Sequence, residues 1–298
     1  MEAFKPLINK FTIMFIPRKI VEEQLVQFLK DDVGQGDATV TAIIPSDLTI
    51  TAKVIAKESG IVAGIEEATI FAQVMNLKVK TRVTDGDQIK DKQILMQITG
   101  DAQTILTVER TLLNLLSRMS GIATATRRLT EKLKEVNSSA RIAATRKTIP
   151  GLLYFDKKAI AIGGGDPHRL HLDDMILIKD NHIALIGEPE KAVKIAKEKA
   201  SFSKKIEVEI TKTSDILEVA KAGADIIMLD NFTAEEVNKA AEILERAELP
   251  QKVLLEVSGG INSETLLDYA CAKVDIISIG TLTHSVKALD LSLYISKK

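Results

Sequence analysis

The second half of the chain repeats short apolar segments separated by helical patterns, and this rhythm limits the possible folds more than any other feature. Strand-like and helix-like segments alternate about every 20 to 30 residues, which is typical of βα units and a parallel sheet. Strands buried on both faces are apolar throughout, as these are. One helix start, Thr233, has Glu236 three residues later, as in a capping box. The candidate strands are 142–144, 160–162, 176–178, 206–210, 226–229, 253–257 and 276–279.

This number of strands within about 140 residues favours an α/β fold, namely an incomplete α/β barrel of parallel strands. In a barrel, the residues that follow the strands meet at one mouth, at the carboxyl ends. An open, doubly wound sheet is the alternative, and it would spread the same residues along a crevice. Most of the segments are followed by polar residues or glycine, so we expect a functional site at the carboxyl ends.

The first part of the chain has a different pattern. Residues 49–74 read as a strand, a glycine-bounded turn and a helix, and 78–106 as alternating strands around the turn signal Asp85-Gly86. This predicts a smaller α+β domain with an antiparallel sheet. A long helical pattern over 104–136, with an expected break near Ser120 and Gly121, joins it to the barrel half.

Composition excludes several classes of function. The net charge of −1 provides no overall field that would attract nucleic acid or an anionic membrane. Tryptophan is absent and aromatic residues are 4% of the chain, so stacking platforms for single-stranded nucleic acid are not expected. No apolar run reaches the roughly 20 residues that span a bilayer. The single cysteine, Cys271, excludes an intramolecular disulfide, fits a reducing cytoplasm, and is predicted to be a small buried residue.

The stretch 144–182 gathers basic side chains beside apolar segments that should be buried. Five basic or hydrogen-donating side chains in it follow candidate strands, so in a barrel they point into one cavity. Arginine binds a carboxylate with two parallel hydrogen bonds, and lysine supplies a point charge. The cluster suits a substrate with two carboxylates, or with a carboxylate and phosphates, although any single member could be a surface charge. The five are Arg146, Lys147, His168, Arg169 and Lys179, and Lys157 and Lys158 lie in the same stretch.

Carboxylates follow two neighbouring candidate strands. Glu207 and Glu209 lie two residues apart and so share a face of one strand, and Asp230 ends the next strand. Acids in this arrangement can hold Mg²⁺, directly or through water, or accept hydrogen bonds from sugar hydroxyls. A structural pairing with lysine is the alternative. The histidines lack the spacing of a zinc site, and no GxSxG nucleophile motif occurs.

A basic pocket beside carboxylates and glycine-rich strand ends indicates chemistry on a phosphorylated sugar, with pyrophosphate as the leaving group. At this point the chain resembles the quinolinate phosphoribosyltransferase family over nearly its whole length. The motifs that carry the resemblance are GQGDATV, ERTLLNLLSRMSGIAT, TRKTIPG, GGGDPHR, LIKDNH, EVE, LDN, SGGI and SIGTLTHS, in this order.

The resemblance implies a fold and a reaction. The fold is an N-terminal α/β sandwich domain over 1–118, joined by the C-terminal tail 287–298, and a barrel catalytic domain over 119–286. The reaction is that of a pentosyltransferase of NAD biosynthesis. It converts quinolinate and phosphoribosyl pyrophosphate into nicotinate mononucleotide, pyrophosphate and carbon dioxide, with Mg²⁺ and without a covalent intermediate. The expected assembly is a cytoplasmic homodimer, alone or within a higher assembly, whose active site is shared between subunits.

The resemblance also assigns roles to residues. Arg110 would reach the quinolinate of the neighbouring subunit, and two positions depart from the family pattern: Leu153, where arginine is frequent, and Asp156, where glutamate is common. Catalytic roles fall to Lys147, Lys179, Glu209 and Asp230, with Glu209 and Asp230 also holding the metal. Substrate-binding roles fall to Arg110, Thr145, Arg146, Lys147, His168, Arg169, Lys179, Glu209, Asp230, Ser258, Gly259, Gly260, Gly280, Thr281 and Leu282.

Two other functions are compatible with part of this pattern. A related phosphoribosyltransferase of molybdate-transport operons, acting on another substrate, would share the fold, but Lys179 in LIKDNH favours the quinolinate enzyme. A non-catalytic sensor of a phosphosugar would share the basic pocket. Binding alone does not require metal-holding acids, so the presence of both Glu209 and Asp230 argues against the sensor.

Overall fold

The chain forms two compact units, each assembled from separate stretches of sequence. The computed structural model describes residues 16–136, 138–270 and 272–295. The first unit comprises the described residues up to Arg127, Tyr154–Gly164 and the described residues from Val286 onward. The second comprises the described residues of Arg128–Leu153 and Gly165–Ser285. Cys271, predicted to be buried, lies outside the described residues.

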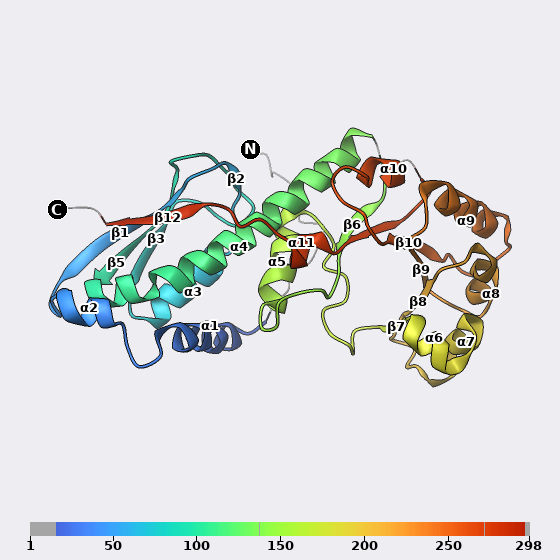
Figure 1. The fold of residues 1–298 in the computed structure, drawn as a ribbon, viewed down its shortest axis with the longest axis horizontal. Coiled ribbons are helices and arrows are strands. Elements are labelled where there is room, and N and C mark those ends of the chain that lie inside the picture. Colours follow the sequence, from blue (N-terminus) through green and yellow to red (C-terminus); the bar gives the residue numbers. More distant parts are fainter. Residues whose placement is uncertain (1–15, 137, 271, 296–298) are drawn as a thin grey trace, which may run out of the picture. The chain divides into compact units, whose positions relative to one another are not determined.

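A four-stranded antiparallel sheet forms the centre of the first unit, as Figure 1 shows. Its edge strand β12 comes from the end of the chain, yet it pairs with β1 so that Leu291 lies opposite Ala56. Two short strands, β2 (Gly60–Ile61) and β4 (Gln88–Ile89), pair separately. In pairing order, the strands of the main sheet are β12 (Leu291–Ile295), β1 (Thr49–Ala56), β5 (Ile94–Asp101) and β3 (Lys78–Thr81).

The longest helix, α4, supplies much of the core of the first unit. Ile105, Leu112, Leu116 and Met119 lie along α4 and are almost completely buried. Their spacing places them on one side of the helix, and burial of each such side chain contributes about 1.5–3 kcal/mol. The helices of this unit are α1 (Arg18–Val33), α2 (Ala38–Ile43), α3 (Ile65–Val74), α4 (Ala102–Glu135) as far as Arg127, and α5 (Leu153–Gly163) from Tyr154 onward.

Helix α4 runs through Ser120 and Gly121 without interruption, so the predicted break is wrong. The glycine has a different purpose. A Cβ atom at position 121 would lie 2.2 Å from the backbone oxygen of Lys287 and 3.0 Å from Cα of Ala288. The returning C-terminal segment therefore needs a residue without a side chain at this point of the helix.

A six-stranded parallel sheet forms the second unit, and helices α6 to α9 lie along its outer side (Figure 1). Strands β7 to β11 follow one another in chain order, and β6 pairs with β11 at the other end. Among the described residues, β6 and β7 do not pair, so the barrel is incomplete, as predicted. The strands are β6 (Arg141–Ala144), β7 (Ile176–Ile178), β8 (Ile206–Ile210), β9 (Ile226–Asp230), β10 (Leu254–Ser258) and β11 (Ile276–Ile279).

Helix α9 begins where the sequence predicts. Thr233 caps α9: its side chain accepts a hydrogen bond from the backbone N–H of Glu236, whose carboxylate accepts one from the N–H of Thr233. None of the described helices is both long and apolar enough to cross a bilayer. The helices of this unit are α6 (Asp180–Ile186), α7 (Pro189–Lys199), α8 (Ile216–Lys221), which the 3₁₀ turn Thr213–Asp215 precedes, α9 (Ala234–Arg246), α10 (Leu266–Ala270) and α11 (Thr281–His284).

One predicted strand, 160–162, is wrong, because these residues form the last turn of α5. A three-residue apolar run fits a buried helix as well as a strand. Phe155, Ala159 and Ile160 are completely buried, at a helical spacing that the short run 160–162 does not reveal. The segment lies in the first unit rather than in the parallel sheet.

Candidate active site

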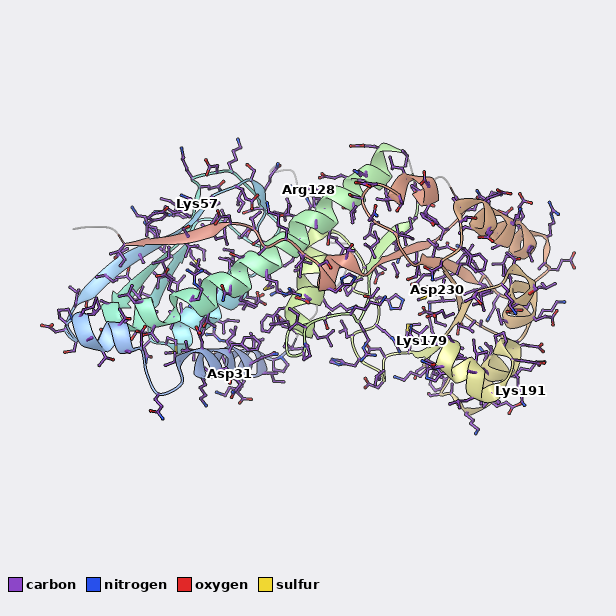
Figure 2. All side chains as sticks on the ribbon, in the orientation of Figure 1. Asp31, Lys57, Arg128, Lys179, Lys191 and Asp230 are labelled. Carbon is purple, nitrogen blue, oxygen red and sulfur yellow. The ribbon has the colours of Figure 1, made fainter. Side chains whose placement is uncertain are left out.

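Two basic and two acidic side chains meet at the carboxyl ends of the parallel strands. Lys179, directly after β7, donates a hydrogen bond from Nζ to Glu209 Oε2 on β8 at 2.8 Å. Asp230 ends β9; Figure 2 labels it and Lys179. Burial raises the pKa of Asp230, the charge of Glu209 raises it further, and the charges of Lys179 and Lys147 lower it. Lys147, Lys179, Glu209 and Asp230 therefore act on one another across a shared space.

The residue after Asp230 fixes this acid in place. Asn231 has left-handed backbone geometry with φ 59°, and its side-chain amide donates to Asp230 Oδ2 at 2.8 Å. Its backbone N–H donates to the carbonyl oxygen of Ser258 on β10 at 2.8 Å. A Cβ atom on Gly259 would lie 2.2 Å from Asn231 Oδ1, so only glycine fits there. Asn231 was not predicted as a site residue, although it lies within the motif LDN.

The segment after β6 lies next to the short helix α11. The hydroxyl of Thr283 donates to the carbonyl oxygen of Lys147 at 2.9 Å, and the hydroxyl of Thr145 accepts from the backbone N–H of Lys147 at 3.2 Å. A Cβ atom on Gly280 would lie 3.1 Å from His284 Nε2 and 3.5 Å from Cδ of Lys147. The predicted phosphate-binding segment 280–282 is thus beside Lys147.

The residues of the two predicted phosphate-binding segments differ in their accessibility to a ligand. Leu282 is buried, at 3% exposure, so its side chain is not available to a ligand. Gly259 and Gly260, at φ 104° and 61°, adopt conformations that favour glycine. The side chain of Thr281 is exposed, and Ser258 is half-buried.

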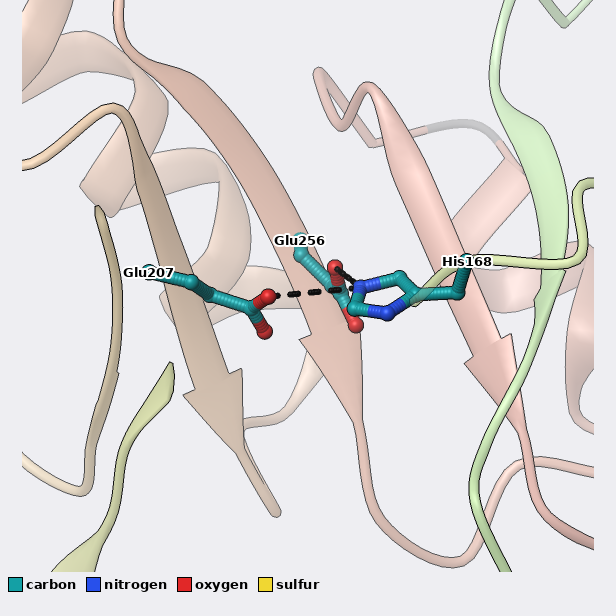
Figure 3. Close-up of side chains that lie close together, drawn as sticks. All are labelled: His168, Glu207 and Glu256. Atoms are coloured by element: carbon teal, nitrogen blue, oxygen red, sulfur yellow. Dashed lines mark hydrogen bonds and ion pairs between the residues drawn. The ribbon is translucent and has the colours of Figure 1, made fainter. Parts of the chain in front are cut away.

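His168 points into the interior of the incomplete barrel, as Figure 3 shows. Its Nε2 lies 3.2 Å from Glu256 Oε2 and 3.3 Å from Glu207 Oε2, and both glutamates are completely buried. Burial alone lowers the pKa of His168, but these two carboxylates outweigh it and raise the pKa to about 10. The imidazole is therefore positively charged at neutral pH.

Glu207 and Glu256 were not predicted as site residues. Both interrupt apolar strands, and Glu207 also lies within the motif EVE beside Glu209. Among the described residues, neither carboxylate oxygen of Glu207 has a hydrogen-bond partner of good geometry. Burial accordingly raises the pKa of Glu207, and the neighbouring charge of His168 lowers it.

Arg169 lies close to other charges of both signs. Burial lowers the pKa of Arg169, repulsion from Arg146 lowers it further, and Glu207 and Asp174 act in the opposite direction. His168 and Arg169 also line a cavity of about 380 Å³ at the other end of the sheet, where Ile226 begins β9. They are thus nearer the amino ends of the strands than Lys179, Glu209 and Asp230 are.

The remaining predicted or noted basic residues lie in the first unit. Arg110 is exposed on α4. Lys157 and Lys158, which the sequence placed in the same basic stretch as the pocket, are buried in α5. Lys158 donates hydrogen bonds to Glu66 and to Glu67 Oε1, the latter at 2.6 Å. Lys158 is therefore neither a surface charge nor part of the cluster around Lys179.

In the part of the chain that the structure describes, three acidic groupings are candidates for a cation site. Glu66, Glu67 and Asp85 lie close together but already neutralise Lys158, and Glu207 and Glu256 likewise neutralise His168. Glu209 also pairs with a cation, Lys179, but Glu209 and Asp230 are both partly accessible, and burial followed by the charge of Glu209 raises the pKa of Asp230. Carboxylate oxygens are ligands that Mg²⁺ prefers, so this accessible pair is where the predicted metal would bind.

Comparisons with known proteins agree with the resemblance found in the sequence. The family model of the quinolinate phosphoribosyl transferase N-terminal domain matches residues 37–120, and the model of the C-terminal domain matches residues 122–294. A Methanocaldococcus jannaschii protein named "Probable nicotinate-nucleotide pyrophosphorylase (carboxylating)" is 47% identical over 271 residues, which cover 90% of this chain and 95% of that protein.

Solved structures show the same similarity. The nicotinate-nucleotide pyrophosphorylase from Francisella tularensis is 34% identical, covers 96% of this chain and 99% of its own, and superposes with a TM-score of 0.85. The corresponding protein from Ehrlichia chaffeensis is 32% identical, covers 95% of this chain and 100% of its own, and gives a TM-score of 0.86.

Proposed function

Because this chain belongs to the quinolinate phosphoribosyltransferase family, we propose that it transfers the phosphoribosyl group of phosphoribosyl pyrophosphate to quinolinate. The products are nicotinate mononucleotide, pyrophosphate and carbon dioxide, so the enzyme is a pentosyltransferase of NAD biosynthesis. The observation that carries the proposal is the meeting of Lys147, Lys179, Glu209 and Asp230 at the carboxyl ends of the strands. The site needs side chains of both charges. Positive side chains bind the anionic substrates, and negative side chains stabilise the transition state, in which the sugar is cationic.

The reaction proceeds in two stages. The ring nitrogen of quinolinate forms a bond to C1 of the ribose as the bond from C1 to pyrophosphate breaks. The ribose gains positive charge in this transition state, and the carboxylates of Glu209 and Asp230 stabilise it. The carboxyl group next to the alkylated nitrogen then leaves as carbon dioxide, its electrons pass to the cationic ring, and a proton takes its place.

The basic side chains bind and orient the substrates. Quinolinate carries two neighbouring carboxylates, which suit Arg146 and Arg169, two guanidinium groups close enough to repel each other. Lys147 and Lys179 neutralise phosphate and carboxylate charge beside the sugar. This arrangement holds the two reactants in position and replaces their water shells, which are the main ways in which an enzyme accelerates such a transfer.

Glu209 and Asp230 are the residues that would hold Mg²⁺, directly or through water. When bound, the ion supplies positive charge that compensates the departing pyrophosphate. Backbone N–H groups of 258–260 and 280–282 would bind the 5′-phosphate, since the glycines there allow close approach of the backbone.

We also propose that the enzyme acts as a homodimer in the cytoplasm. Arg110 is exposed and belongs to the first unit, whereas the other candidate residues belong to the second unit. An exposed arginine is free to enter the site of a neighbouring subunit and to bind quinolinate there. The single cysteine of the chain fits a reducing compartment.

The names of the relatives do not favour the alternatives, a related enzyme with another substrate or a phosphosugar sensor. A single assay separates the three. Protein, Mg²⁺ and phosphoribosyl pyrophosphate are incubated with quinolinate, and nicotinate mononucleotide is followed by absorbance. We expect product to form. Tight binding without product would support the sensor, and turnover only with another pyridine or purine acceptor would support the related enzyme.

Two variants test the role of the acids. Glu209→Gln and Asp230→Asn should each reduce kcat by about 100-fold or more, because they remove charge that acts only in the transition state. Glu235→Gln, an exposed position on α9, is the matched control and should retain full activity. Unchanged turnover in both site variants would exclude these acids from the reaction.

A further inference from the structure

We propose that Glu207 and Glu256 are positioning residues, which hold the ring of His168 and thereby set the place of Arg169. The inference rests on the proposed function, because it takes Arg169 as a ligand of quinolinate. The two glutamates come from separate strands, β8 and β10, and converge on one nitrogen of one imidazole (Figure 3).

The sheet itself holds the two acids that surround the ring of His168. Glu207 and Glu256 are completely buried side chains of regular parallel strands. The hydroxyl of Ser278, on the adjacent strand β11, donates to Glu256 Oε1 at 2.6 Å, while His168 Nε2 lies 3.2 Å from the other oxygen of the same carboxylate. Both oxygens of the Glu256 carboxylate therefore have a partner. The inner face of the sheet presents two buried carboxylates to the ring of His168.

The negative charge of the two carboxylates favours one position of the His168 ring. Two buried carboxylates without a cation would be costly, and among the described residues Glu207 has no hydrogen bond of good geometry to offset that cost. His168 is the cation that reaches both acids, so the free energy that favours neutralisation also favours one position of the ring. The charged groups that act on this imidazole are Glu207 from β8 and Glu256 from β10.

The backbone around His168 is organised to deliver the ring. His168 has left-handed geometry with φ 55°, which is uncommon for a residue with a side chain. Its backbone N–H donates to Asp166 Oδ1 at 2.8 Å, and Asp166 itself bonds through its backbone to Ile142 and Ala144 of β6. The segment around His168 is therefore attached to β6, at one edge of the sheet. From there the imidazole ring extends to the buried glutamates.

Arg169 lies between this anchor and a second one. The backbone N–H groups of Leu170 and His171 donate to Asp174 Oδ2 at 2.6 and 3.0 Å. If the ring of His168 lost its contacts with the glutamates, only the bonds to Asp174 would hold the segment around Arg169. Its guanidinium, which is already repelled by Arg146, would then move away and weaken the binding of a dicarboxylate.

The test uses full-length Glu207→Gln and Glu256→Gln enzymes, which keep the size and shape of the side chain. Each should raise the KM for quinolinate by about 10-fold or more, while the KM for phosphoribosyl pyrophosphate changes less than about 3-fold. Glu242→Gln, on the outer helix α9, is the matched control and should change neither. Equal effects on both KM values, or none on that of quinolinate, would overturn the proposal.

A second measurement separates positioning from a general loss of structure. The chain has four histidines, so ¹⁵N NMR can follow His168 directly after comparison with His168→Gln. In the wild-type enzyme both ring nitrogens should carry protons from pH 6 to pH 8, and either glutamate variant should bring its titration down toward this range. A neutral His168 in the folded wild-type enzyme would refute the proposal.

A double-mutant cycle tests whether the glutamates act through the histidine. If they do, Glu256→Gln combined with His168→Gln should bind quinolinate no more weakly than His168→Gln alone. Additive effects would mean that Glu256 acts independently and would overturn the inference. Turnover by the wild-type enzyme is measured first, since its absence would remove the proposed function rather than this inference alone.

The same three side chains are a possible metal site, and the experiment distinguishes that outcome. Zn²⁺ is titrated into the wild-type enzyme and into Glu256→Gln by calorimetry. We expect no stoichiometric binding that depends on Glu256. Tight binding of one ion that the substitution abolishes would assign the trio to a metal and overturn the proposal.

Discussion

At the scale of single residues, Lys179 acts on both acids of the candidate active site. It bonds to Glu209 at 2.8 Å and lowers the pKa of Asp230, and it is still partly exposed to an incoming substrate. Lys179→Met should reduce kcat/KM by about 100-fold or more, because it removes a positive charge from the substrate and leaves Glu209 unpaired. Steady-state kinetics measure the effect.

Lys191→Met is the control for this prediction, because Lys191 is an exposed lysine on the neighbouring helix α7 (Figure 2). It should leave kinetics unchanged. If Lys179→Met retained kcat/KM within about 3-fold of the wild-type value, Lys179 would have no part in binding or turnover.

Asp85, in the first unit, should make stability depend on pH. Burial raises the pKa of Asp85 to about 6, although it accepts a hydrogen bond from the backbone N–H of Ile65 at 2.8 Å. A carboxyl with a raised pKa stabilises the folded state fully below its unfolded value, near pH 4, and loses this contribution as the pH rises through 6. The free energy of unfolding should therefore fall over this window.

Chemical denaturation of the wild type and of Asp85→Asn between pH 4 and pH 7 checks this prediction. The amide cannot ionise, so the variant should lose less stability than the wild type as the pH rises. Asp91→Asn, at an exposed position a few residues along the chain, is the control and should follow the wild-type curve. Parallel curves for wild type and Asp85→Asn would contradict the prediction.

At the scale of elements, the continuity of α4 depends on a glycine that looks like a helix breaker. Alanine is favoured over glycine in a helix by up to about 1 kcal/mol. At position 121, however, the added Cβ would lie 2.2 Å from a backbone oxygen that cannot rotate away. The clash should dominate, so Gly121→Ala should destabilise the protein by about 1–3 kcal/mol.

Thermal and denaturant unfolding measure this effect. Arg128→Ala, at an exposed position of the same helix, serves as the control and should change the free energy of unfolding by less than about 0.5 kcal/mol. A Gly121→Ala protein more stable than the wild type would show that the segment around Lys287 does not need this close approach.

At the scale of the whole molecule, a shared active site predicts complementation between two inactive chains. Arg110→Ala and Arg169→Ala should each lose activity as homodimers, because each removes one cation from every site. Co-expression should restore one intact site in each mixed dimer. With random pairing, the recovered activity should be about a quarter of the wild-type value.

The activity of the unfractionated mixture tests this expectation, and the mixed dimer purified with two different affinity tags should show about half of the wild-type value. A mixture of two inactive chains bearing Arg146→Ala and Arg169→Ala is the control, since both residues lie in the second unit and should not complement each other. No recovery with the Arg110→Ala and Arg169→Ala pair would count against a site shared between subunits.

The sequence was informative where short-range pattern decides the structure. Apolar runs identified six strands of the parallel sheet, and the Thr233–Glu236 spacing identified a helix start. The sequence did not predict the structure where the deciding contact joins residues far apart in the chain. Lys158 can be buried because it pairs with Glu66 and Glu67. These two acids lie 92 and 91 residues away in the chain, so no local sequence pattern reveals the pairing. The partners of His168, on two other strands, were missed for the same reason.

The strand β12 has a consequence for how the chain is made. The ribosome synthesises β1 before the second unit and β12 after it, so every residue of the second unit is translated before the sheet of the first unit can be completed. Until then β1 has an unpaired edge, which can recruit a strand from another nascent chain. A premature stop codon just before β12 should therefore yield a protein whose parallel sheet assembles but whose amino-terminal half aggregates.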